Sequence, residues 1–171
     1  MLKIAHNISN LSDARYFAAA GFDWIIFNFG PGAAEHKHQL YGISEWISGS
    51  LLGIHVASVD ELEYHLAHHP EIKGFWLDPL IEIDHQLEGI FLFSANTSIK
   101  SSETYFISQA INPIADPSDS ILDLSNFDPA DLDLKDLKMA GITLSGSEEE
   151  RPGFKSYGNI EDWMSFCKSA I

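Results

Sequence analysis

The sequence predicts an α/β protein that closes into a compact (β/α)8 barrel. The first observation is the stretch from Leu2 to Phe29, which reads as strand, helix and strand. The second is that short apolar runs recur along the whole chain, with helical or turn-like segments between them. A strand–helix–strand unit crosses over in one hand, so each repeat adds a parallel strand in the same sense. Eight such strands are the number that closes this barrel.

The opening unit carries signals for each of its elements. Asn10 suits the N-cap of a helix. The apolar positions of that helix fall on one face: Leu11, Ala14, Phe17 and Ala18. Gly21 ends the helix where a left-handed residue is favoured. The run from Trp24 to Phe27 is continuously apolar, which is typical of a parallel strand covered on both faces.

Six later apolar runs predict the remaining strands: Leu51–Val56, Lys73–Asp78, Gly89–Ala95, Thr104–Ile107, Ile121–Leu124 and Ile142–Leu144. Ser58 and Glu61 form a capping box for a helix that stops at Pro70. Asp128 before Pro129 predicts another helix start. Asn159 is expected to cap a last helix.

The chain is short for this fold, which typically takes about 250 residues. The polar segment Asn96–Glu103 is too short for a good helix, and Ile111–Asp119 contains two prolines. Reduced crossovers are therefore expected after strands five and six. They would leave barrel surface uncovered, which predicts a homodimer that buries this side. An open, flavodoxin-like parallel sheet is the structural alternative.

Length and composition restrict the class of protein. The 171 residues suit one domain, spanning 1–171, with a full core. The formal net charge of -15 argues against nucleic acid, whose binding needs a basic surface. No apolar run approaches the roughly 18 residues of a membrane span, and no signal peptide precedes the first strand. The single cysteine, Cys167, is expected to be a buried apolar residue, and it fits a reducing, cytoplasmic location.

Several segments, in order along the chain, resemble the phosphoribosylanthranilate isomerase family. Gly141–Lys155, which reads GITLSGSEEERPGFK, resembles the family's C-terminal motif. Phe127–Asp131 is similar to its segment after strand seven. Near the start, the matching segments are Lys3-Ile4, Asn10–Ala14, Ala20–Asp23 and Phe27–Phe29. The resemblance implies a barrel that rearranges an aminoaldose to an aminoketose in tryptophan biosynthesis.

The residues that carry this chemistry in the family have no clear counterparts here. The family uses a cysteine at the end of strand one and an aspartate at the end of strand six as acid and base. Ala5 stands at the cysteine position, or His6 if an insertion is placed earlier, and strand six ends in Ser108-Gln109. Asp123 could supply the acid only in an alignment that sacrifices the match at Phe127–Asp131.

The resemblance therefore implies a retained scaffold without the catalytic pair, and this predicts a barrel that binds a phosphorylated metabolite or a partner. The family's anthranilate-contacting arginine is absent from 35–38, and Ser125-Asn126 replaces its phosphate-binding glycines. A phosphate would contact Ser145, Gly146, Ser147 and Asn126. Glu148, Glu149 and Glu150 would oppose it unless they point outward. An isomerase with substituted groups and a non-enzymatic interaction module are the alternatives.

If chemistry remains, His6 and Asp78 are the candidate acid–base pair. Both lie at or near carboxyl ends of predicted strands, where barrel enzymes hold their sites. Histidine titrates near neutral pH and suits a general base. The same end of the barrel predicts pocket-lining roles for Ala5, Asn28, His55 and Ser108.

No metal or cofactor is expected from the sequence. His36-Lys37-His38 has no second ligand cluster at a recognisable spacing. His65, His68 and His69 lie at a helix end, where cationic side chains suit the helix dipole. The chain has no glycine-rich nucleotide loop.

Overall fold

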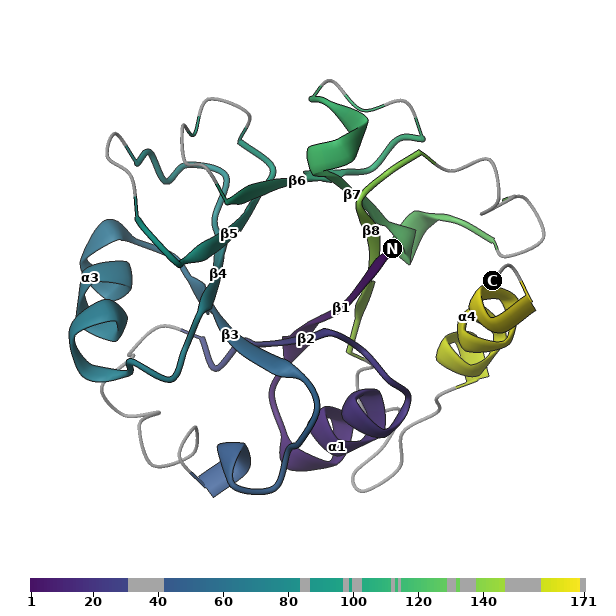
Figure 1. The fold of residues 1–171 in the computed structure, drawn as a ribbon, viewed down its shortest axis with the longest axis horizontal. Helices are drawn as coiled ribbons and strands as arrows, with labels where there is room; N and C mark the ends of the chain where they lie inside the picture. The colour runs from purple at the N-terminus through teal and green to yellow at the C-terminus, as the bar shows by residue number, and fades with distance from the viewer. Residues whose placement is uncertain are drawn as a thin grey trace.

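A closed barrel of eight parallel strands, paired in chain order, forms the protein (Figure 1). The computed structural model describes residues 1–30, 42–83, 87–96, 99, 103–111, 113, 115–128, 132, 138–146 and 158–169. The strands are β1 (Leu2–Ile8), β2 (Trp24–Phe27), β3 (Leu51–Val56), β4 (Gly74–Leu77), β5 (Phe91–Ser94), β6 (Thr104–Ser108), β7 (Ser120–Asp123) and β8 (Gly141–Ser145). Every predicted strand is present.

The pairing of the last strand with the first closes the barrel. Leu2 to His6 of β1 lies in parallel register with Gly141 to Ser145 of β8. An open sheet would leave these two strands as edges. The open-sheet alternative is therefore wrong and the (β/α)8 barrel is confirmed.

Among the described residues, the helices α1 (Leu11–Ala19), α3 (Val59–His68) and α4 (Gly158–Ser169) lie outside the ring of strands (Figure 1). Asn10 caps α1, because its Oδ1 accepts a hydrogen bond from the Asp13 N–H at 2.9 Å. Ser58 caps α3 through the Glu61 N–H at 3.2 Å. None of the described helices is long and apolar enough to cross a membrane.

The last helix differs slightly from its prediction. α4 begins at Gly158, so Asn159 lies inside the helix and is not its cap. The predicted helix start at Asp128-Pro129 cannot be compared, since residues 129–131 lie outside the described part of the chain.

The crossover after β6 is reduced, as expected. Over 109–111, 113 and 115–119, the only helical element described is the 3-10 turn η1 (Pro117–Asp119). A second 3-10 turn, η2 (Leu124–Asn126), directly follows β7. The crossover after β5 lies mostly outside the described residues.

Alternating side chains divide the apolar core into two layers, as the period of a strand requires. One layer fills the barrel and contains Ile4, Trp24, Ile26, Phe93 and Ile121. The other packs the strands against the helices and includes Ala5, Phe27 and Phe75 of the strands with Phe17 and Trp163 of the helices. This alternation decides which residue at each strand end faces the mouth of the barrel.

Candidate functional site

A cavity of about 160 Å³ opens at the carboxyl ends of the first four strands. Its lining residues are His6, Asn7, Ile26, Asn28, His55 and Trp76. Ile26 belongs to the layer that fills the barrel and so forms the apolar floor. The carboxyl end of a (β/α)8 barrel is the face that carries active sites in the enzymes of this fold.

His6 enters this cavity from β1. Its ring stacks on Trp76 of β4, with 4.5 Å between ring centroids and 15° between planes. Its Nε2 is buried and has no hydrogen-bond partner among the described residues. Burial lowers the pKa of His6 to about 4; Asp123 acts in the opposite direction and His55 adds to the lowering. His6 is therefore neutral at pH 7.

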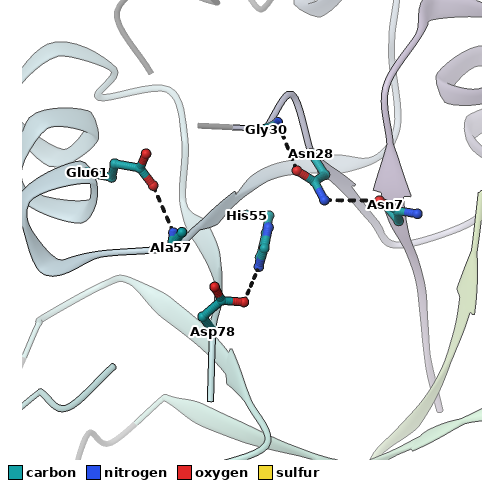
Figure 2. Close-up of polar contacts among 7 residues, drawn as sticks. All are labelled: Asn7, Asn28, Gly30, His55, Ala57, Glu61 and Asp78. Carbon is teal, nitrogen blue, oxygen red and sulfur yellow. Dashed lines mark hydrogen bonds and ion pairs between the residues drawn. The ribbon is translucent and has the colours of Figure 1, made fainter. Parts of the chain in front are cut away.

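His55 and Asp78 form a hydrogen-bonded pair at the ends of β3 and β4 (Figure 2). His55 Nε2 lies 3.0 Å from Asp78 Oδ1. A carboxylate only accepts, so the Nε2 of a neutral His55 carries the proton and its Nδ1 is an acceptor. The sequence paired Asp78 with His6, but the structure pairs Asp78 with His55. The hydrogen-bonded pair at the mouth is therefore His55–Asp78, and the acid–base roles of His6 and Asp78 stay a prediction.

Two asparagines frame the other side of the cavity (Figure 2). Asn28 Nδ2 donates to Asn7 Oδ1 at 3.0 Å, and the Gly30 N–H donates to Asn28 Oδ1 at 3.0 Å. Asn7 has a φ of +58°, a left-handed conformation that asparagine tolerates better than most residues. The register of β1 against β2 shifts between Ala5 and Ile8, as in a β-bulge. Bulges next to barrel rims re-aim side chains, here Asn7 and its neighbours.

The remaining sequence-predicted residues take other places. Ala5 does not line the cavity, because its side chain is fully buried in the layer between strands and helices. Ser108 lies at the end of β6 and donates to the Ala110 carbonyl at 2.8 Å. Neither residue belongs to the cavity lining.

The predicted phosphate-binding turn is described only in part. Ser145 Oγ donates to the Gly146 carbonyl at 3.2 Å, and the Gly146 N–H donates to the His6 carbonyl at 2.8 Å. That N–H is therefore already used within the protein. Ser147 and the side chain of Asn126 lie outside what the structure describes.

Four residues near the site were not assigned to it from sequence. Asn7, Ile26 and Trp76 line the cavity. Asp123 ends β7 and lies close enough to His6 to act on its pKa. The sequence of β7 could have indicated Asp123, because Ile121 faces the barrel interior and the alternation of side chains along a strand puts Asp123 on the same face.

Histidines elsewhere do not gather into a metal site within the described residues. No group of three or more His, Cys, Asp or Glu side chains there could hold a metal ion. His65 within α3 and His69 at its C-cap are buried, and His69 Nδ1 lies 3.2 Å from Glu71 Oε1. Residues 36–38 fall outside the described ranges.

Fold and site together define a (β/α)8 barrel with a polar cavity at its carboxyl mouth. Comparison with solved structures finds the phosphoribosylanthranilate isomerase of Thermus thermophilus, at a TM-score of 0.65, 15% identity and full coverage of both chains. Monomers of the dimeric phosphoribosylanthranilate isomerase of Thermotoga maritima align at a TM-score of 0.62 and 14% identity, over 99% of this chain and 100% of theirs. No family model and no curated protein matches the sequence. At these identities the likeness confirms the isomerase-like fold that the resemblance implied.

Proposed function

We propose that this isomerase-like barrel binds a small metabolite in its mouth cavity and does not catalyse the isomerase reaction. The observation that carries the proposal is the cavity itself, a concave space of about 160 Å³ with four polar side chains, from His6, Asn7, Asn28 and His55. Concave sites with a few convergent polar groups are where small molecules bind. The buried Nε2 of His6, which has no partner among the described residues, is a further indication, because a bound ligand would satisfy it.

Loss of the isomerase reaction is argued from two positions. Ala5, which stands at the family's cysteine position in one alignment, faces away from the mouth and has no group that moves a proton. The other alignment puts the neutral, buried His6 at this position. The end of β6 carries Ser108, whose hydroxyl is bonded to the backbone, in place of a carboxylate. Proton transfer between adjacent carbons needs both an acid and a base, so both positions would have to be replaced.

A phosphorylated metabolite is the ligand that the family resemblance implies. It would lie against Ser145 and Gly146 at the end of β8. The Gly146 N–H already donates to His6, so a phosphate there would depend on groups outside the described residues. Inorganic phosphate and ribose 5-phosphate therefore belong in the test.

The binding proposal is tested by a thermal-shift screen of phosphorylated, neutral and cationic metabolites. Each compound that raises the Tm of the wild type should need at least a tenfold higher concentration to raise the Tm of His6→Phe equally, because this substitution alters the cavity. Asp119→Asn is the control, because it changes an exposed residue just before β7, at the opposite end of the barrel. Equal stabilisation of His6→Phe, or no stabilising compound in any class, would overturn the proposal.

An acid–base enzyme with substituted groups is the second candidate. The hydrogen bond between His55 and Asp78 favours it, since a carboxylate that holds one imidazole nitrogen leaves the other as a base. Such an enzyme would lose its turnover in His55→Gln.

We also propose a homodimer that covers the barrel on the side of β6. The described part of the crossover there holds only η1, and Ile111 is 48% exposed within it. Light scattering at high protein concentration should give the mass of a dimer, and a monomeric mass would contradict this proposal.

A further inference from the structure

Among the described side chains, carboxylates lie at both ends of the barrel, but lysines lie at only one. Asp78 follows β4 and Asp123 ends β7, so both carboxylates lie at the carboxyl mouth. The lysines whose side chains are described lie at the other end: Lys3 near the start of β1, Lys73 before β4 and Lys138 before β8. Within these described side chains, no lysine or arginine lines the cavity.

The groups around the cavity include hydrogen-bond acceptors beside the Asp78 carboxylate, together with the amide N–H donors of Asn7 and Asn28. His55 Nε2–H donates to Asp78 Oδ1, which leaves His55 Nδ1 as an acceptor. Asp78 does not itself line the cavity, but it bonds His55, which does, and its side chain is 44% exposed. His6 adds no positive charge, because burial holds its pKa at about 4.

We propose that the cavity takes a small organic amine in its protonated form and rejects anions of the same size. This inference rests on the proposed function, which places the ligand in this cavity. An ammonium group would lie against Asp78 and donate to the acceptors around it, whereas an anion would be repelled by Asp78 and Asp123. Carboxylates beside a cleft raise the local concentration of cations.

The size of the cavity limits the ligand further. Pockets for drug-sized molecules measure roughly 300–1,000 Å³, and this cavity measures about 160 Å³. The apolar floor at Ile26 and the edge of Trp76 suit a short aliphatic segment. An alkylamine of a few carbons meets both conditions.

Three four-carbon probes of nearly equal length separate charge from size: 1,4-diaminobutane, 1,4-butanediol and butanedioate. Each is titrated into the protein at fixed ionic strength and pH 7. The imidazole resonances of His6 and His55 and the indole resonance of Trp76 report on the cavity by NMR. The diamine should shift these resonances in a saturable way, with an affinity at least tenfold above that of the dianion.

Two variants separate the cavity from general attraction to an acidic protein. Asp78→Asn removes the charge but keeps an oxygen that accepts from His55. It should lower the affinity for the diamine at least fivefold. Asp119→Asn removes one charge from an exposed position at the opposite end and should leave the affinity unchanged. Equal weakening in both variants would mean non-specific attraction and would overturn the inference.

The remaining outcomes distinguish this inference from the proposed function. If butanedioate or the diol shifts the cavity resonances more strongly than the diamine, the ligand class is wrong and the binding site stands. If no probe shifts these resonances, the amine inference fails, and the screen of metabolites decides whether the cavity binds any ligand.

Discussion

Replacement of Gly74 by alanine should destabilise the barrel by about 3 kcal/mol, because the interior has no room for the added methyl group. A Cβ at this position would overlap the ring of Trp24, its nearest neighbour. Trp24 is 2% exposed and cannot turn aside, since Phe91 and Phe93 each lie with ring centroids 5.3 Å from its own. The free energy of unfolding is measured by urea titration of the wild type and the variant.

Gly42→Ala is the matched control, because nothing lies within 4 Å of a Cβ at that glycine. It should change the free energy of unfolding by no more than about 0.5 kcal/mol. Adding Trp24→Phe to Gly74→Ala should recover part of the loss by making room for the methyl group. A Gly74→Ala protein as stable as the wild type would contradict the packing of the barrel interior.

His6→Phe should stabilise the protein at pH 7 and flatten its response to acid. Phenylalanine keeps the stacking on Trp76 and removes the buried Nε2 that has no described partner. Removing an unsatisfied buried polar group is worth about 1–3 kcal/mol. The variant keeps the shape of the ring, so no cavity is created.

The pH dependence follows from the pKa of His6. The unfolded chain takes up a proton on this ring near pH 6.5, whereas the folded protein does so only near pH 4. Between these values the unfolded state binds more protons, so stability falls as the pH falls. The loss due to His6 should approach about 3 kcal/mol at pH 4 in the wild type and be absent from the stability curve of His6→Phe.

Unfolding free energies measured between pH 7 and pH 4.5 test this expectation. His68→Phe is the control, because His68 is exposed and also stacks on an aromatic ring, that of Tyr64 at 4.3 Å. Parallel curves for the wild type and His6→Phe would mean that His6 is solvated, which would contradict its place in the cavity.

The sequence predicted the barrel well because the signals for its strands are local. Each strand is a short apolar run between turn residues, and the capping residues Asn10 and Ser58 mark two helix starts. Closure followed from counting parallel strands. The start of α4 was misplaced by two residues, since a cap at Asn159 would begin the helix at Ile160 and it begins at Gly158.

The site was predicted less completely because it depends on strand register and on which side chains of each strand face the barrel interior. His55 lies opposite Trp76 in the β3–β4 pairing, which brings Asp78 to His55, and that register cannot be read from either strand alone. Polar residues stand on both faces of β1, with Lys3 and Asn7 on one and His6 on the other. Its sequence therefore did not show that Ile4 and His6 face the interior while Ala5 faces the helices.

The most direct test of a barrel that kept its fold without the isomerase reaction is turnover of freshly prepared phosphoribosylanthranilate, followed by the loss of substrate fluorescence. Purified wild type, His6→Phe and His55→Gln are assayed at increasing protein concentration. We expect the fluorescence to fall no faster with the wild type than in a solution without protein. A rate that rises with wild-type concentration and is lost in His55→Gln would contradict this account and show that the acid–base chemistry has been rebuilt on the His55–Asp78 pair.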